Sequence, residues 1–169
     1  MKGPPSIFVA LGSNLGDSAR VVRDALAGLR VVSAAPVASS SLWASTPVDC
    51  PPGSPMFVNA VARLEAREGE TPETLLDALQ AMEREAGRRP KQVLNEPRPL
   101  DLDLLAWEGV VMTTPRLVLP HPRAHLRRFV LQPWSELAPG WRVAGVGRTV
   151  LELLSGLQTD EALRRLEEP

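Results

Sequence analysis

Residues 97–105 of this chain read PRPLDLDLL, so leucine alternates with aspartate through Asp101 and Asp103. A period of two is typical of a strand with one buried face, which predicts that the leucines face a core and the aspartates face the opposite side. The two carboxylates would then project in parallel, roughly 6.5–7 Å apart at the backbone. That spacing allows both to bind one divalent cation or to share a pair of cations. The alternative for an isolated motif of this kind is a solvated sheet face, so the neighbouring residues matter.

Composition indicates one globular domain that spans residues 1–169, because 44% of the 169 residues are hydrophobic. The formal net charge of −1 argues against a protein that binds nucleic acid or anionic membranes. Cys50 is the only cysteine, which excludes an internal disulfide and a cysteine-based zinc site. The sequence contains no signal peptide and no apolar segment of membrane length, so we expect a cytoplasmic protein.

Hydrophobic periodicity and turn residues predict the order strand, helix, strand, strand, helix, strand, with additional C-terminal elements. The expected strands cover residues 7–11, 37–46, 56–64 and 100–105, with a short partner strand at 110–112, and the expected helices cover residues 18–29, 71–87, 129–137 and 159–166. This order is that of a ferredoxin-like β-α-β-β-α-β sandwich in the α+β class. We therefore expect a mostly antiparallel sheet with helices packed on one face, which leaves the other face free to carry the carboxylates.

Basic residues surround the aspartate pair along the sequence. Arg88 and Arg89 end the preceding helix, Arg98 enters the strand, and Arg116, His121, Arg123, Arg127 and Arg128 follow it. Each alone is expected to be a solvated surface charge. Carboxylates that bind Mg²⁺ beside arginines that bind phosphate oxygens are, however, the parts of a phosphoryl-transfer site, and we interpret the combination in this way. His121 remains open as a structural histidine, a phosphate donor or a proton carrier.

Phe57 and Asn59 are predicted to lie on one face of the strand at 56–64, next to a proline-rich loop. A side-chain amide offers a donor and an acceptor, which suits a flat heterocycle with amide-like edges. Phe129 is the second candidate to contact such a ring. The alternative for Phe57 is ordinary packing in the core.

The chain resembles the 6-hydroxymethyl-7,8-dihydropterin pyrophosphokinase family of folate biosynthesis in a series of short segments. They are residues 10–17 (ALGSNLGD), 46–47, 57–60 (FVNA), 83–88, 97–105, 119–123 (LPHPR), 127–131 and 136–139. The ordered set is specific and spans most of the chain. The resemblance implies an ATP-dependent transferase that moves pyrophosphate from ATP to the hydroxymethyl group of the dihydropterin and releases AMP.

The resemblance also implies roles for individual residues. Asp101 and Asp103 match positions that bind two Mg²⁺ ions, and they would act in catalysis together with Arg88 and Arg98. The positions that match ATP-binding residues of the family are Gln80, Glu83, Arg88, Arg98, Arg116, His121 and Arg127. The positions that match its pterin-binding residues are Thr46, Pro47, Val48, Asp49, Phe57, Asn59 and Phe129, with the two phenylalanines on opposite faces of the ring. We see no dedicated general base and expect positioning with charge neutralisation to suffice.

The loop from Arg89 to Glu96 departs from the family, whose members often carry further arginines and a tryptophan there. An ungapped match places Pro90, Leu94 and Asn95 at positions that are often basic or aromatic. We expect this loop to act as a lid that moves during the reaction.

Two other functions remain open on the residues alone. One is another two-metal enzyme that uses the same D-x-D strand, such as a nucleotidyltransferase, which would release pyrophosphate where a pyrophosphokinase releases AMP. The other is a nucleic-acid-binding module, for which the usual stacking aromatics on adjacent strands are missing. We expect ATP and the dihydropterin as partners, no nucleic acid and no membrane, and a monomer.

Overall fold

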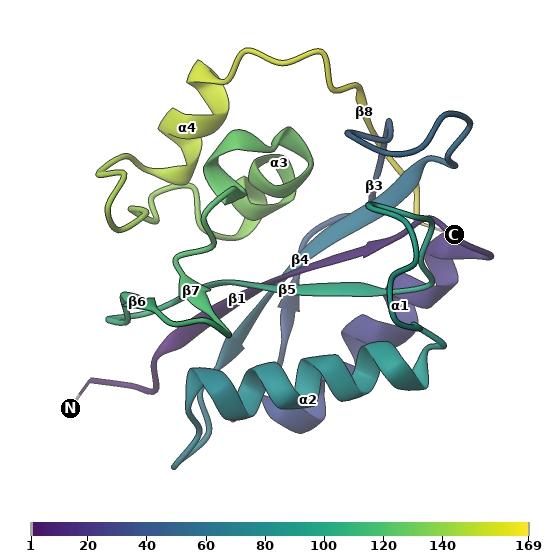
Figure 1. The fold of residues 1–169 in the computed structure, drawn as a ribbon. Helices are drawn as coiled ribbons and strands as arrows, with labels where there is room; N and C mark the ends of the chain where they lie inside the picture. The colour runs from purple at the N-terminus through teal and green to yellow at the C-terminus, as the bar shows by residue number, and fades with distance from the viewer. Residues whose placement is uncertain (1, 169) are drawn as a thin grey trace.

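A computed structural model describes residues 2–168, which form an antiparallel sheet with helices on both of its faces (Figure 1). Within these residues the main sheet consists of β1 (Ser6–Ser13), β2 (Ala38–Ser39), β3 (Trp43–Ser45), β4 (Phe57–Glu65), β5 (Asp101–Trp107) and β8 (Leu163–Arg165). The strand order is β5-β1-β4-β3-β8, with β2 also paired to β4. A separate hairpin joins β6 (Met112–Thr113) to β7 (Val118–Leu119).

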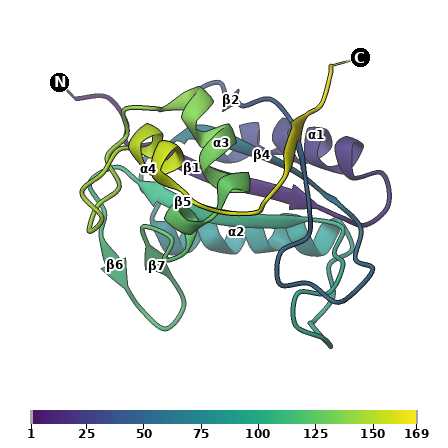
Figure 2. The ribbon, with the colours of Figure 1, turned by 90° about the horizontal axis from the view of Figure 1, so that it is seen from above.

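The helices form two layers, one on each side of the sheet (Figures 1 and 2). The first layer holds α1 (Ser18–Gly28) and α2 (Pro72–Glu85), and the second holds α3 (Arg128–Leu137) and α4 (Val150–Gly156). Short 3₁₀ helices cover Leu29–Val32 and Ala124–Leu126. The succession β1-α1-β3-β4-α2-β5 confirms the predicted ferredoxin-like α+β order. The expectation that helices occupy only one face is wrong, because α3 and α4 bring a second apolar layer to the other face.

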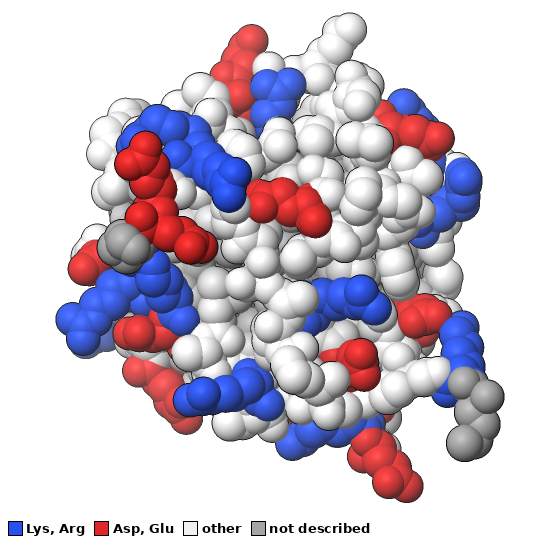
Figure 3. All heavy atoms as spheres, turned by 180° about the vertical axis from the view of Figure 1, so that it is seen from behind, with Lys and Arg blue, Asp and Glu red and all other residues white. Residues whose placement is uncertain are grey.

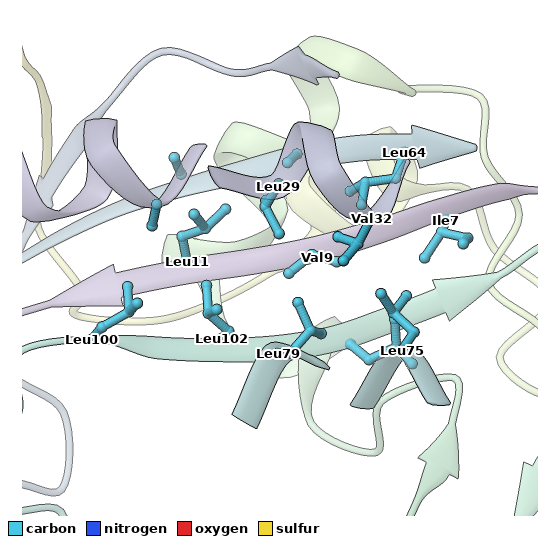
Figure 4. Close-up of a cluster of buried hydrophobic side chains, with 14 of the residues drawn as sticks. Ile7, Val9, Leu11, Leu29, Val32, Leu64, Leu75, Leu79, Leu100 and Leu102 are labelled. Carbon is cyan, nitrogen blue, oxygen red and sulfur yellow. The ribbon is translucent and has the colours of Figure 1, made fainter. Parts of the chain in front are cut away.

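The core on the α1–α2 side is built from alternate residues of the strands. Ile7, Val9 and Leu11 of β1, and Leu100, Leu102 and Leu104 at and within β5, pack here against Leu75 and Leu79 of α2 (Figure 4). The three leucines around the aspartates are each at most 4% exposed, which confirms the direction predicted for them. Helix α2 starts where the sequence predicts, because the Thr71 side chain accepts the backbone N–H of Thr74 and Pro72 occupies the first turn.

The core on the α3–α4 side uses the intervening residues of the same strands. Phe8 of β1 and Leu105 of β5 pack against Trp134 of α3, with 5.5 Å between the ring centroids of Phe8 and Trp134. Val150 and Leu153 of α4 extend this layer. The apolar contacts lie toward one end of β1 and β5, while the aspartates lie toward the other end of β5.

The C-terminal region differs most from the prediction. The helix expected at residues 159–166 is wrong, because Leu163–Arg165 forms β8 and pairs with β3. Helix α4 lies earlier in the chain than the predicted helix. The partner strand expected at 110–112 is also wrong, since β5 pairs with β1, and Met112–Thr113 pairs with Val118–Leu119. Strand pairing joins residues far apart in the sequence, so local periodicity cannot predict it.

The extended segment expected at residues 37–46 consists of two short strands, β2 and β3, that both pair with β4.

The face of the molecule shown in Figure 3 carries acidic and basic side chains interspersed with one another. None of the helices formed by residues 2–168 combines the length and the apolar character that crossing a bilayer requires.

Candidate active site

A cavity lies where β1, β4 and β5 meet the loop after β3 and the start of α3. Strand pairing sets a row across its floor, in which Gly12 of β1 lies opposite both Asp101 of β5 and Asn59 of β4. A side chain on Gly12 would place its Cβ 3.5 Å from Asn59 Oδ1, so glycine leaves the space beside that oxygen free. The lining residues are Ala10, Leu11, Gly12, Ser45, Thr46, Val48, Asp49, Cys50, Phe57, Asn59, Asn95, Arg98, Asp101, Asp103, Arg123, Arg127, Phe129 and Val130.

The cavity gathers most of the residues that the sequence singles out. These are Thr46, Val48, Asp49, Phe57, Asn59 and Phe129 of the predicted pterin set, together with Arg98, Asp101, Asp103 and Arg127. Of the other predicted residues, all of which the structure describes, Pro47, Gln80, Glu83, Arg88, Arg116 and His121 do not line it. The carboxylates and the predicted pterin residues therefore share one cavity, whereas much of the predicted ATP set lies outside it.

Asp101 and Asp103 differ in how their charges are compensated. Arg88 Nη1 donates to Asp101 Oδ1 at 2.5 Å and also pairs with Glu83 of α2, and Arg98 Nε lies 3.7 Å from Asp101 Oδ2. Withdrawal from water, and then the negative charge of Asp101, raise the pKa of Asp103 to about 7. Burial also raises the pKa of Glu83. Of the three carboxylates Glu83, Asp101 and Asp103, Asp103 is thus the one whose negative charge the arginines compensate least.

This donor set fits Mg²⁺. The ion prefers oxygen ligands, and proteins usually hold it by one or two carboxylates together with substrate phosphates. No group of three or more His, Cys, Asp or Glu within residues 2–168 is arranged to hold a metal ion. Asp101 and Asp103 would therefore hold Mg²⁺ together with phosphate oxygens and water, and the positive charge would offset the repulsion that raises the pKa of Asp103.

Comparison with known proteins gives the family. The model of the 7,8-dihydro-6-hydroxymethylpterin-pyrophosphokinase (HPPK) family matches residues 8–139. The chain belongs to this family. A 2-amino-4-hydroxy-6-hydroxymethyldihydropteridine pyrophosphokinase of Pseudomonas aeruginosa is 41% identical over 150 residues, which are 88% of this chain and 90% of the relative. A protein of the same name from Mycobacterium bovis is 37% identical and covers 90% of this chain and 84% of its own length.

Solved structures of the HPPK family share the fold. Wild-type Plasmodium falciparum HPPK-DHPS with pteroate superposes with a TM-score of 0.67 over 92% of this chain, at 11% sequence identity. At that identity the likeness shows the fold alone. This chain spans 43% of that longer protein.

Within the cavity, Asn59 presents its oxygen rather than its nitrogen. The residue is 4% exposed, and its Nδ2 donates to Ser45 Oγ at 2.7 Å and to the carbonyl oxygen of Trp43 at 3.4 Å. Because a carbonyl oxygen only accepts, these partners fix the amide orientation and leave Oδ1 beside Gly12. The sequence did not point to Ser45, since a serine in a serine-rich stretch gives no signal of its own.

Each of the two phenylalanines that line the cavity, Phe57 and Phe129, is in contact with an arginine. Arg98 Cζ lies 5.7 Å from the centroid of the Phe57 ring, and Arg127 Cζ lies 5.5 Å from that of Phe129. These distances are those of cation–π contacts. An anion held by either guanidinium group would therefore lie next to the phenylalanine that this group contacts.

The turn after β1 holds Arg98 in place. The backbone N–H of Arg98 donates to Asn14 Oδ1 at 2.9 Å, and the backbone N–H of Asn14 donates to the carbonyl oxygen of Arg98 at 3.2 Å. Asn14 is 1% exposed. Its role was not predicted, because its partner lies far away in the sequence.

The surroundings of His121 favour its neutral form. Burial, and then the positive charge of Arg127, lower the pKa of His121 to about 4. Its Nδ1 accepts the backbone N–H of Arg123 at 3.1 Å, which leaves Nε2 as the hydrogen-bond donor. Of the three interpretations left open by the sequence, the proton carrier near neutral pH is the least compatible with this environment. Arg116 pairs with Asp77 on the exposed surface.

A hydrogen bond joins the two long loops beside the cavity. Asn95 Nδ2 donates to the backbone oxygen of Asp49 at 2.7 Å. Both residues have positive φ, 53° and 52°, a conformation that asparagine and aspartate adopt more readily than most residues. The loop from Arg89 to Glu96 is thus tied by a polar contact to the loop that follows β3.

Proposed function

We propose that this chain transfers pyrophosphate from ATP to the hydroxymethyl group of 6-hydroxymethyl-7,8-dihydropterin, with release of AMP, as a step of folate biosynthesis. The observation that carries the proposal is the row in which Gly12 separates Asp101 from Asn59 on the floor of one cavity. A place for metal and phosphate and a place for a flat heterocycle are then adjacent. Transfer between two substrates requires this proximity.

The pterin would lie between Phe57 and Phe129. Asn59 Oδ1 would accept an N–H of the ring edge, because the nitrogen of the same amide is already occupied. The loop residues Thr46, Val48 and Asp49, with Pro47 shaping the backbone between them, would complete the recognition through main-chain groups. Apolar faces with one oriented polar group are the usual composition of such sites.

The triphosphate of ATP would lie on the arginine side of the cavity. Arg98 and Arg127 are positioned to donate to phosphate oxygens, and Arg88 would join them by exchanging Asp101 for phosphate. His121 would donate through Nε2. Gln80, Glu83 and Arg116 would contact the remainder of the nucleotide outside the cavity. Two Mg²⁺ ions would be held by Asp101 and Asp103 together with the phosphates.

The reaction is a displacement at phosphorus. The hydroxyl oxygen of the pterin attacks the β-phosphorus, the bond from that phosphorus to the α–β bridging oxygen breaks, and AMP leaves with this oxygen. Mg²⁺, when bound, supplies charge neutralisation on the phosphates and lowers the pKa of the hydroxyl, whose proton passes to water. Arg88 and Arg98 compensate the charge on the transferred group, and the two phenylalanines hold the acceptor in line.

We further propose that residues 1–169 act as one domain, as a monomer in the cytoplasm, and that the loop from Arg89 to Glu96 closes over the bound substrates. The Asn95–Asp49 hydrogen bond supports the loop proposal, because it links this loop to the loop that carries the predicted pterin contacts. Light scattering in solution tests the monomer, and a dimer at micromolar concentration would contradict it.

Incubation of the full chain with Mg²⁺, ATP and the reduced hydroxymethylpterin tests the function. We expect AMP and the pterin pyrophosphate in equal amounts, and no AMP when the pterin is omitted or when EDTA is present. Chromatography of the nucleotides measures both. Release of inorganic pyrophosphate without AMP would instead indicate a nucleotidyltransferase and would overturn the proposal.

A further inference from the structure

The C-terminal segment, residues 157–166, reaches two walls of the cavity although it lies outside the part that matches the HPPK family model, residues 8–139. It runs from α4 past α3 to β8, where it pairs with β3 (Figures 1 and 2). Its central residues, Glu161 and Ala162, contact one wall each. No role in the reaction described above uses either residue.

The first wall is the loop that begins at Thr46. The backbone N–H of Thr46 donates to the carbonyl oxygen of Ala162 at 3.3 Å, and the backbone N–H of Ala162 donates to Thr46 Oγ1 at 3.4 Å. Ser45, which orients Asn59, lies opposite Leu163 in the β3–β8 pairing. The C-terminal segment therefore extends the sheet at the point where the chain leaves it to form the loop.

The second wall is Phe129, in the first turn of α3. The first backbone N–H groups of a helix have no partner within the helix. Arg127, the residue before this helix, gives no side-chain hydrogen bond to it. The backbone N–H of Phe129 donates instead to Glu161 Oε2 at 3.1 Å, and Arg128 Nη1 donates to the backbone oxygen of Glu161 at 3.4 Å.

Glu161 is suited to this role by its position. It is 9% exposed, which is unusual for a glutamate, and such burial occurs when the carboxylate has a partner. A carboxylate at a helix N-terminus also interacts favourably with the helix dipole. Two consecutive residues of the same segment therefore hold the two walls. Glu161 binds the wall that carries Phe129, and Ala162 binds the loop that carries Thr46.

We propose that Glu161 is a positioning residue that holds Phe129 in place relative to β3 and the Thr46 loop, and so sets the gap between Phe129 and Phe57, whose strand pairs with β3, into which the pterin would fit. The inference rests on the proposed function, because it takes the cavity to be the pterin site. It assigns a part of the pterin specificity of this enzyme to a side chain that does not touch the pterin.

Steady-state kinetics of three variants test the proposal. Glu161→Ala removes the acceptor, Glu161→Gln keeps a neutral acceptor of the same length, and Glu152→Ala removes the glutamate that accepts the N–H of Thr149 at the start of α4, away from the cavity. We expect Glu161→Ala to raise the KM for the pterin about tenfold and to leave the KM for ATP within about twofold. Glu161→Gln should restore most of the pterin affinity. Glu152→Ala should lower thermal stability without changing either KM.

The outcomes separate this inference from the function on which it rests. If the wild-type chain forms no AMP, the proposed function fails. If the wild-type chain forms AMP and a folded Glu161→Ala variant keeps the wild-type KM for the pterin, or raises both KM values equally, the positioning role is wrong. Should Glu161→Ala not fold, hydrogen exchange of the Phe129 amide in the wild type and in Glu161→Gln decides. Protection in both proteins, deepened by the pterin, supports the role, and rapid exchange of this amide in the folded wild type contradicts it.

Discussion

The two faces of the sheet use the same strands in different ways. On the α1–α2 side, Leu100 and Leu102 are 2% and 4% exposed and join a closed apolar layer. On the α3–α4 side, the intervening Asp101 and Asp103 line a cavity. Alternation along a strand lets consecutive residues serve folding and chemistry separately. The comparison teaches that a substitution on one face should be felt mainly as lost stability and on the other mainly as lost activity.

The largest effect is expected on the cavity face. Asp101→Asn or Asp103→Asn should lower AMP formation by about a thousandfold or more, which corresponds to about 4 kcal/mol, because a neutral amide oxygen binds Mg²⁺ much more weakly than a carboxylate does. The far-ultraviolet circular dichroism spectrum should not change. Asp24→Asn, at an exposed position of α1, is the matched control and should keep full activity. Near-normal AMP formation by either cavity variant would overturn the metal assignment.

The residue between the two aspartates gives the opposite result. Leu102→Ala should lower the free energy of unfolding by about 2–4 kcal/mol, because it leaves a hole in the closed layer. Below the unfolding transition, the kcat of the folded protein should remain within about threefold of wild type. Urea titration and initial rates measure the two quantities. A Leu102→Ala protein that is fully stable but inactive would break the division between the faces.

A smaller and more selective effect is expected at Asn59. Asn59→Ala should weaken pterin binding about ten- to hundredfold, because it removes the acceptor on the cavity floor, and should leave nucleotide binding unchanged. Ser45→Ala, which frees the Asn59 amide to rotate, should also weaken pterin binding, but by a smaller factor. Calorimetry with each ligand separately measures both variants. If Asn59→Ala weakened nucleotide binding and left pterin binding unchanged, the assignment of Asn59 to the pterin would be wrong.

The smallest effect concerns the pH dependence of stability in the metal-free protein. The pKa of Asp103 in the fold is about 7, above its ordinary value of 3.8, so the folded state binds this proton more tightly than the unfolded state. The stabilisation is complete below about pH 4 and is lost as the pH rises through 7. Relative to Asp103→Asn, wild type should lose about 1–2 kcal/mol across that range, after allowance for screening by solvent. Parallel curves for the two proteins would show that Asp103 titrates normally.

Much of the fold could be predicted from local patterns. The alternation around Asp101 predicted which side chains are buried, and Thr71-Pro72 predicted the start of α2. The C-terminal strand could not be predicted, because Leu163–Arg165 becomes a strand only by pairing with Trp43–Ser45. Helix periodicity in such a short segment does not outweigh the hydrogen bonds that a neighbouring strand edge offers.

The candidate site divides in the same way. The sequence pointed to Asp101, Asp103, Phe57 and Asn59 because their residue types stand out in their strands. It did not point to Ser45 or Glu161, whose partners Asn59 and Phe129 lie 14 and 32 residues away. Such residues act through contacts that exist only after folding.

By itself the sequence determined the family, the order of the first elements, the direction of the side chains around Asp101 and Asp103, and the shared face of Phe57 and Asn59, because these follow from spacing along the chain. Only the tertiary structure decided that Gly12 lies between Asp101 and Asn59, that the Asn59 oxygen faces the cavity, and that the pKa of Asp103 is raised. The physical reason is that hydrogen bonding, burial and electrostatic repulsion depend on which distant residues become neighbours, and the neighbours are set by the packed sheet.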